Sequence, residues 1–320
     1  MKKNILNLLI ILFLCLILIC ILIFSNDVLQ TVLFAFTIWK ENVFTSLFPI
    51  FITTDLLINY GFIELIGEAS KKIMNRLFYL PGEASFVIIG SMLSGFPSSA
   101  KYIKELLDKK FITESEGQYL LSFTHFSNPL FVIGVIGNLL NNKSLGFLIL
   151  LVHISVNFLI AFLIRKKESI TNTKINMKSA FKSIEKRRKE NSFIKVLTSS
   201  IMKTINTLLL LLGIITTFLV LSKIVNNIIN LNTIYQSFIN GILEMTQGIK
   251  YVSMLSIPLN IKASIITFFI SFGGISIHLQ ITSILSDTNI KYKYYLFSRI
   301  IHATISSILI YFIVTKFYWV

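Results

Sequence analysis

The sequence predicts an all-α integral membrane protein with about six transmembrane helices and two re-entrant helical hairpins in an inverted repeat. Apolar residues make up 54% of the 320 positions and charged residues only 14%, whereas a soluble domain carries about 25% charged residues. Several apolar runs reach the roughly 20 residues that a helix needs to cross a bilayer. Two further runs are too short to cross and end in a glycine-centred break. This composition excludes a soluble enzyme.

The first apolar run, residues 5–24, follows Lys2 and Lys3. A secretory signal peptide begins in the same way, but no small-x-small cleavage site follows this run. We therefore expect residues 1–27 to hold a retained transmembrane helix with a cytoplasmic N-terminus. Cys15 and Cys20 both lie inside the run, where two buried apolar thiols are a better interpretation than a disulfide.

Residues 28–165 form the first of two predicted repeats. A second span covers residues 43–64 and contains Asp55. A basic amphipathic segment around Lys71 follows, and we expect it at the cytoplasmic surface. The repeat ends with a clear span over residues 144–164.

Between these two spans lies an apolar run, residues 84–93, that is too short to cross a bilayer but has the length of a re-entrant segment. It ends in Ser94-Gly95-Phe96-Pro97-Ser98-Ser99, and lysines follow at once. We predict a re-entrant helical hairpin near residues 83–109 that turns at Gly95-Phe96-Pro97 and has both ends on the cytoplasmic side. Residues 113–141 are apolar again and are interrupted at Ser127-Asn128-Pro129.

A basic segment, residues 166–203, separates the two repeats. From Arg165 to Lys203 there are twelve Lys or Arg against three Glu, within a chain of net charge +15. One interpretation is a patch for nucleic acid or an acidic partner. The other is a cytoplasmic loop that obeys the positive-inside rule. The apolar spans on both sides favour the loop, so we expect no nucleic-acid partner.

Residues 204–320 form the second predicted repeat. Residues 204–225 and 294–318 are long enough to span, and residues 231–252 are mixed and amphipathic. A second short apolar arm breaks at glycines, which predicts a second re-entrant hairpin near residues 259–286.

An internal similarity supports the two repeats. Gly95 and Gly274 stand 179 positions apart, and other matches keep this offset. The charges place the first hairpin on the cytoplasmic side and the second on the opposite side, which leaves Lys291 and Lys293 on the outer side. Inverted repeats with discontinuous helices are the architecture of many secondary transporters.

The breaks in the two short arms predict a binding site. Lipid cannot satisfy the backbone groups of a hairpin tip, so the tip must face protein, water or a ligand. The first residues of a returning arm present free N–H groups and the positive end of the helix dipole, which suit an anion. The alternative is a glycine or proline kink packed between helices. The predicted substrate-binding residues are Ser94, Gly95, Phe96, Pro97, Ser98, Ser99, Asn128, Glu244, Gly273, Gly274, Ser276 and Gln280.

Three ionisable residues in apolar segments are candidates for proton or ion coupling: Asp55, Glu244 and His153. Asp55 falls near the middle of its span, where a charge is costly and usually functional, unless the helix begins earlier than we expect. Glu244 is equally compatible with a solvated interfacial carboxylate. A lone mid-span histidine such as His153 more often forms a helix–helix hydrogen bond. Metal-ligand, triad and phosphate-loop patterns are absent from the sequence, so we expect no enzyme, metal or cofactor.

An ordered set of short motifs resembles the signatures of the sporulation integral membrane protein YlbJ family. The resemblance covers roughly residues 30–318. Phe96 stands where Tyr is expected, and His125-Phe126 replaces a more usual polar pair. The motifs are Leu47-Phe48-Pro49-Ile50-Phe51, Leu80-Pro81-Gly82, Ser94-Gly95-Phe96-Pro97, Ser127-Asn128-Pro129-Leu130-Phe131, Glu244-Met245-Thr246-Gln247-Gly248, and Gly273-Gly274-Ile275-Ser276 with Gln280.

The resemblance implies a nucleoside-recognition, or Gate, domain that is similar in fold to part of the concentrative nucleoside transporters. It also implies a location in the outer forespore membrane of an endospore-forming bacterium, and the movement of dipicolinic acid toward the forespore. The expected partners are a small anionic substrate, the lipid bilayer and other sporulation membrane proteins. The sequence does not indicate an oligomeric state.

Three functions remain open on the sequence. The first is a transporter with a site between two hairpins. The second is a non-transporting membrane scaffold that recruits a partner through residues 166–203. The third is a nucleoside transporter, sensor or channel that uses the same site.

Overall fold

The computed structural model describes residues 2–165, 176–190, 192–229 and 232–317. These residues form helices and their connections, and no β-strand occurs among them. Six segments of this described part are long and apolar enough to cross a membrane, which confirms the predicted all-α membrane protein with about six spans. The segments are Ile5–Ile23, Ser25–Asn59, Lys143–Ile164, Phe193–Ile228, Leu259–Ile284 and Tyr292–Phe317.

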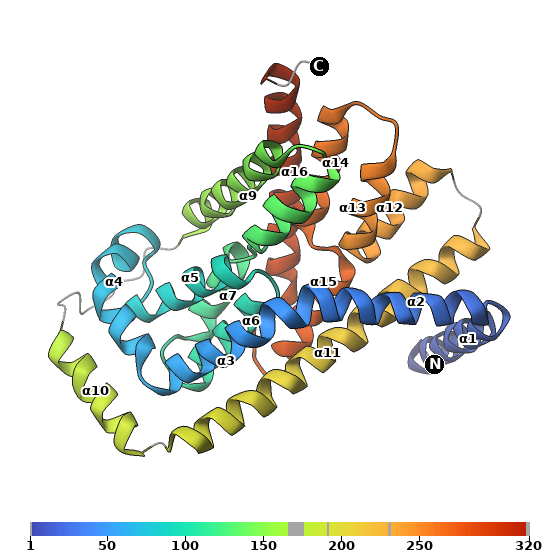
Figure 1. The fold of residues 1–320 in the computed structure, drawn as a ribbon. Coiled ribbons are helices and arrows are strands. Elements are labelled where there is room, and N and C mark those ends of the chain that lie inside the picture. Colours follow the sequence, from blue (N-terminus) through green and yellow to red (C-terminus); the bar gives the residue numbers. More distant parts are fainter. Residues whose placement is uncertain (1, 166–175, 191, 230–231, 318–320) are drawn as a thin grey trace.

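Two very long antiparallel helices cross the molecule (Figure 1). The first joins α2 (Ser25–Ile38), the π-helical η1 (Trp39–Phe44) and α3 (Thr45–Asn59) into a continuous span of 35 residues. The second is α11 (Phe193–Ile228), with 36 residues. At 1.5 Å per residue each is about 50 Å long, well over the roughly 30 Å of a bilayer core. Each must therefore tilt or extend beyond the hydrocarbon.

Side-chain contacts fix the register of this long pair. At one end, the Asn227 amide donates to the Asp27 carboxylate at 2.7 Å. At mid-length, Trp39 Nε1 donates to the carbonyl oxygen of Leu208 at 2.8 Å. The sequence placed the second span at 43–64, but the helix begins 18 residues earlier, at Ser25. This happens because the polar residues near Asp27 pair with α11 instead of ending the helix.

The remaining N-terminal elements flank this pair. The apolar helix α1 (Lys2–Ile23) precedes it, and most of its side chains are exposed on the protein surface, as suits contact with lipid. The amphipathic helix α4 (Phe62–Phe78) follows Gly61, whose φ of 89° ends α3. The chain then bends by 89° into η2 (Gly82–Ala84) and α5.

The basic segment between the halves is partly helical. Residues 166–175 lie outside the described part of the chain. Met177–Glu190 form α10, which packs on α4 through an ion pair between Arg187 and Glu64. The structure therefore differs from a loop over 166–203, since the end of that range, from Phe193 on, already belongs to α11.

The first predicted reversal is present. Helices α5 (Ser85–Ser94) and α6 (Ser98–Asp108) double back at Gly95, whose φ is 79°. Gly90 permits the close packing of the two helices, because a Cβ there would lie 2.8 Å from the Tyr102 ring. Entry of this pair into the membrane remains a prediction.

The second reversal lies elsewhere than predicted. Helices α12 (Thr233–Leu243) and α13 (Met245–Met254) are joined only by Glu244, whose backbone is extended. The prediction of a hairpin near residues 259–286 is wrong, since α14 (Leu259–Phe272) and α15 (Gly274–Ile284) continue in one direction as a single candidate span. The glycine break interrupts the helix without reversing it.

The packing of α14 on α16 fixes its direction. It lies along α16 (Tyr292–Phe317), where the Ser264 hydroxyl donates to the Ser307 carbonyl oxygen at 3.0 Å and Asn260 donates to Thr315 at 2.8 Å. These contacts hold α14 antiparallel to α16.

An interrupted helix also stands in the first half. Helix α7 (Glu114–Phe123) begins with a capping box, in which Thr113 and Glu116 satisfy each other's backbone N–H groups. The chain is irregular at residues 124–128 and then forms η3 (Phe131–Ile136) and α8 (Gly137–Leu139).

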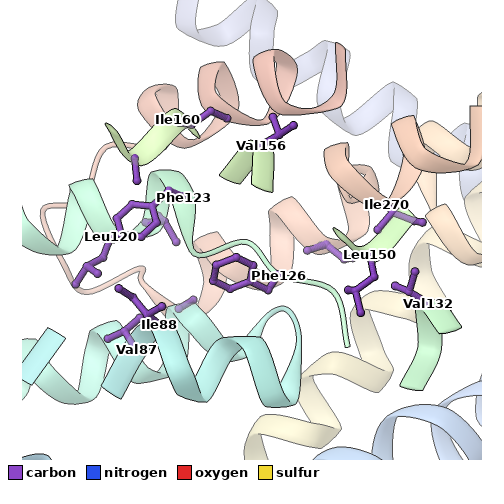
Figure 2. Packing of buried hydrophobic residues seen from close by; sticks show 14 of the residues in the cluster. Val87, Ile88, Leu120, Phe123, Phe126, Val132, Leu150, Val156, Ile160 and Ile270 are labelled. Carbon is purple, nitrogen blue, oxygen red and sulfur yellow. The ribbon is translucent and has the colours of Figure 1, made fainter. Parts of the chain in front are cut away.

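Helix α9 (Lys143–Ile164) closes the first half as α16 closes the second. The two helices are antiparallel, because His302 of α16 contacts the carbonyl oxygen of His153 at 2.9 Å while Arg299 reaches Asn157 at 3.1 Å. The main apolar core lies between α5, α7, α9 and α14, and Figure 2 shows Phe123, Phe126 and Ile270 within it.

The order of elements therefore occurs twice: a long helix, a pair of short helices, an interrupted helix and a straight helix. Corresponding elements run in opposite directions, as the long pair and the pair of α9 and α16 show. The two turns, at Phe96 and Glu244, are 148 positions apart, and the starts of α9 and α16 are 149 apart. The repeat is inverted, with this offset in place of the predicted 179.

The ends of these elements define two faces. Lys104 of α6 pairs with Asp287, and the backbone N–H of Lys291 donates to the Gln118 side chain at 2.6 Å. The connection 285–291 thus joins the feet of α6 and α7, together with α4 and α10, at what we call the basic end. The sequence placed Lys291 and Lys293 on the outer side, and the structure corrects this because α15 crosses to the basic end.

Candidate functional site

The two turns, the first interruption and α15, which follows the second interruption, meet around one cavity of about 540 Å³. The turn between α5 and α6, the irregular stretch before η3, the turn between α12 and α13, and α15 each contribute to its lining. The long helices α2–α3 and α11 supply a wall. Four elements that are far apart in the sequence are thereby brought to one place.

Half of the predicted substrate-binding residues line this cavity. They are Ser94, Phe96, Pro97, Asn128, Glu244 and Gln280. The other six are not among the lining residues: Gly95, Ser98, Ser99, Gly273, Gly274 and Ser276. The hydroxyl oxygens of Ser98, Ser99 and Ser276 are buried and lack a hydrogen-bond partner among the described residues.

Asn128 joins the first turn to the first interruption. Its side-chain amide donates to the carbonyl oxygen of Ser94 at 3.4 Å, and its Oδ1 accepts from the N–H of Leu130 at 2.8 Å. Gly95 makes this junction sterically feasible, because a Cβ there would stand 2.6 Å from the Asn128 nitrogen. The turn and the interruption therefore form one rigid corner of the cavity.

Glu244 forms the second turn and caps α13. One carboxylate oxygen accepts from the N–H groups of Thr246 at 2.9 Å and Gln247 at 3.1 Å, and from the Thr246 hydroxyl. Only 4% of Glu244 is exposed, so it is a buried lining residue and not a solvated interfacial carboxylate. Its carboxylate occupies the positive N-terminus of α13.

Sequence reasoning missed several lining residues. Ser127, Thr246, Gln247 and Lys250 line the cavity, and Glu41 lies on its α2–α3 wall. Thr246 and Gln247 belong to the motif from Glu244 to Gly248, but no proline or internal glycine marked this segment as a break in a helix.

A comparison with known proteins also indicates a membrane protein. The sporulation integral membrane protein YlbJ of Bacillus subtilis (strain 168) is 29% identical to this chain over 304 residues, which cover 86% of the chain and 74% of that protein. The chain is thus similar to a YlbJ protein over most of its length. Its apolar helices and this similarity support an integral membrane protein, and the similarity supports a role in sporulation. No protein-family model matches the chain, and no solved structure matches it.

A buried polar network lies next to the cavity. His153 contacts the Ser271 hydroxyl at 3.2 Å and accepts from the N–H of Ser127 at 3.2 Å. These bonds between helices match the structural interpretation of a lone mid-span histidine. The His125 ring stacks on the Phe96 ring, with the two ring centroids 4.6 Å apart, and thereby connects the network to the cavity.

Arg299 lies at the centre of this network and is fully buried. Its guanidinium donates to Asn157 Oδ1 at 3.1 Å and to the Ser122 carbonyl oxygen at 2.5 Å. These bonds connect α16 with α9 and α7, so Arg299 orders the helices that support the first interruption.

Asp55 lies outside the cavity. It sits four residues before the end of α3 and is 1% exposed, and it accepts a hydrogen bond from Ser200 of α11. The position near a helix end agrees with the alternative that the helix begins earlier than 43. Within the described residues, no group of three or more His, Cys, Asp or Glu side chains could hold a metal ion.

Proposed function

We propose that this protein transports a small anionic solute, dipicolinic acid, across the outer forespore membrane. The observation that carries the proposal is the cavity between two turns, the first interruption and α15, which come from halves that run in opposite directions. Secondary transporters place their substrate at such a junction and alternate its access between the two sides. Interrupted helices are tolerated at membrane depth where they line a cavity.

The chemistry of the lining supports an anion. Lys250 is the cation among the lining residues, and the Asn128 and Gln280 amides supply hydrogen-bond donors. Helices α6 and α15 both begin beside the cavity, so the positive ends of their dipoles lie near it. Glu244 opposes an anion when it is charged, which makes it our candidate for carrying a proton together with the substrate.

The size of the cavity also agrees with the proposal. A volume of about 540 Å³ falls within the roughly 300–1,000 Å³ of small-molecule sites. Dipicolinate is one pyridine ring with two carboxylates, so it fits with space for water. The second carboxylate would need a partner of its own, which the amides provide.

The test is uptake of labelled dipicolinate into liposomes that contain the purified protein, with and without a proton gradient. Lys250→Met, Asn128→Ala and Gln280→Ala should each lower uptake about tenfold or more, since a hydrogen bond to a charged group is worth roughly 1.5–3 kcal/mol. Lys72→Met is the matched control, because Lys72 is an exposed lysine on α4. Wild-type uptake by all three cavity variants would refute the site.

The same preparation separates the other two functions. Uptake of nucleosides in place of dipicolinate would indicate the nucleoside transporter. A scaffold would need the basic segment, so replacing residues 166–190 with a neutral linker should abolish its function and leave transport intact. The replacement must end before Phe193, where α11 begins.

A further inference from the structure

Three helices run from the cavity floor toward the basic end. The cavity is lined by Leu47 of α3, by Pro97 directly before α6 and by Leu211 of α11. One turn below Leu47 lies Phe51, which is 1% exposed and approaches the fully buried Tyr102 ring with centroids 6.5 Å apart. An apolar layer therefore seals the floor on this side.

A layer of charges lies directly beneath these aromatic rings. The Lys203 ammonium of α11 stands 3.9 Å from an oxygen of Asp55 on α3 and 3.7 Å from an oxygen of Glu105 on α6. Lys101 of α6 is 8% exposed, and its ammonium stands 4.0 Å from the centroid of the Phe51 ring. These four residues, the floor cluster, link the returning arm of the first hairpin to both long helices.

The contacts within the floor cluster are weak enough to break when α6 moves away. Asp55 Oδ1 and the Lys101 ammonium have no hydrogen-bond partner within the described part of the chain. The two ion pairs of Lys203 are also longer than a hydrogen bond. The Lys203 side chain is 53% exposed, and ion pairs of such an exposed lysine contribute little to stability, so water can replace them at little cost.

The lining of the cavity is exposed at Glu41, Leu130 and Lys250, which we call its rim. Glu41 lies ten residues before Phe51 on the long α2–α3 helix, away from the floor cluster. Alternating access requires this rim to close and the floor to part. α6 leads directly from the cavity to the floor cluster.

We infer that the floor cluster is the gate on the basic end of the cavity, closed in this structure, and that it opens by separation of α6 from α3 and α11. The inference rests on the proposed transport function, for which it supplies the second access route. Lys203 holds the gate closed, because its ammonium neutralises Asp55 on α3 and Glu105 on α6, which lie on opposite sides of the opening.

The first test needs no substrate. In a background with Cys15→Ser and Cys20→Ser, the Ser127→Cys variant places a thiol on the cavity lining. A membrane-impermeant thiol reagent is added from the basic end in oriented vesicles, and the rate of labelling is measured. Lys203→Met should raise this rate about fivefold or more, the size of a typical shift between two conformations.

Lys223→Met is the matched control. Lys223 lies on the same helix and stands 3.5 Å from Asp27 at the opposite end, so its loss should not change labelling from the basic end. Lys203→Arg keeps the charge and should label at the original rate. An unchanged rate in Lys203→Met, or an equal rise in Lys223→Met, would overturn the inference.

A second measurement links the gate to transport. Glu105→Cys with Lys203→Cys, bridged by a cleavable bifunctional thiol reagent, should block dipicolinate uptake until the bridge is reduced. Asp27→Cys with Asn227→Cys, bridged in the same way between two helices of the long pair, should transport normally. Undiminished uptake with the first bridge would refute the gate. Absence of dipicolinate uptake in every variant, together with the labelling change, would instead refute the proposed substrate.

Discussion

Gly248 of α13 lies against Gly241 of α12 so closely that a Cβ on Gly248 would stand 2.1 Å from the Gly241 Cα. We expect Gly248→Ala to force the two helices apart and to destabilise the protein by about 1–3 kcal/mol or more, the cost of overpacking. The measurement is thermal unfolding of the purified protein in detergent. Gly213→Ala on α11 is the control, since nothing lies within 4 Å of its added methyl group; an equal loss in both variants would contradict this packing.

Arg299 carries the second prediction. Arg299→Met leaves Asn157 Oδ1 and the Ser122 carbonyl oxygen without their donor in a fully buried place. An unpaired buried polar group costs roughly 1–3 kcal/mol, so we expect a clear fall in the unfolding temperature. Arg76→Met, at an exposed position on α4, should change it little. If the two variants unfold at the same temperature, Arg299 does not order the helices.

The ion pair of Lys104 and Asp287 predicts a dependence on pH. The hydrogen bond from Lys104 lowers the pKa of the Asp287 carboxyl in the folded state. A group with a lowered folded pKa stabilises the protein above its unfolded pKa, and this contribution is lost as the pH falls through the folded value. Lys104→Met should therefore unfold at a lower temperature than the wild type near about pH 7, with the gap narrowing toward about pH 3. A gap of constant size would refute the pairing, and Lys72→Met should show none.

The corrected orientation of α15 and α16 is also testable. In the cysteine-free background, Asn289→Cys and Lys178→Cys should react with an impermeant thiol reagent from the same side of oriented vesicles. Ser256→Cys should react only from the other side, because the span Leu259–Ile284 separates it from residue 289. Labelling of Asn289→Cys from the side of Ser256→Cys would restore the orientation that the sequence alone suggested.

Much of this fold was predictable because a bilayer imposes it. Apolar length alone located most of the spans, and the Gly-Phe-Pro sequence located the first reversal. The starting point of the second span was missed, because Asp27 and its polar neighbours look like a helix end until α11 supplies Asn227 and Lys223 as partners.

Half of the predicted substrate-binding residues line the cavity. Glycine and proline breaks are visible in a sequence, and they led to Ser94, Asn128 and Gln280 on the lining. Lys250 was missed because nothing local distinguishes it from a residue of an ordinary amphipathic helix. It reaches the cavity only because α12 and α13 fold back at Glu244.

The sequence by itself determined that this chain lives in a membrane, that its helices are interrupted, and that its halves are related. Only the tertiary structure decided which interruption reverses the chain. A glycine permits both a kink and a turn, and the chain continues past Gly273 because His278 of α15 contacts the Phe272 carbonyl oxygen and the Tyr292 hydroxyl of α16, each at 2.9 Å. At Glu244 the chain turns without a glycine in the link, because the carboxylate caps α13 and two facing glycines let α12 approach. Reversal depends on packing partners far away in the sequence, which local composition does not contain.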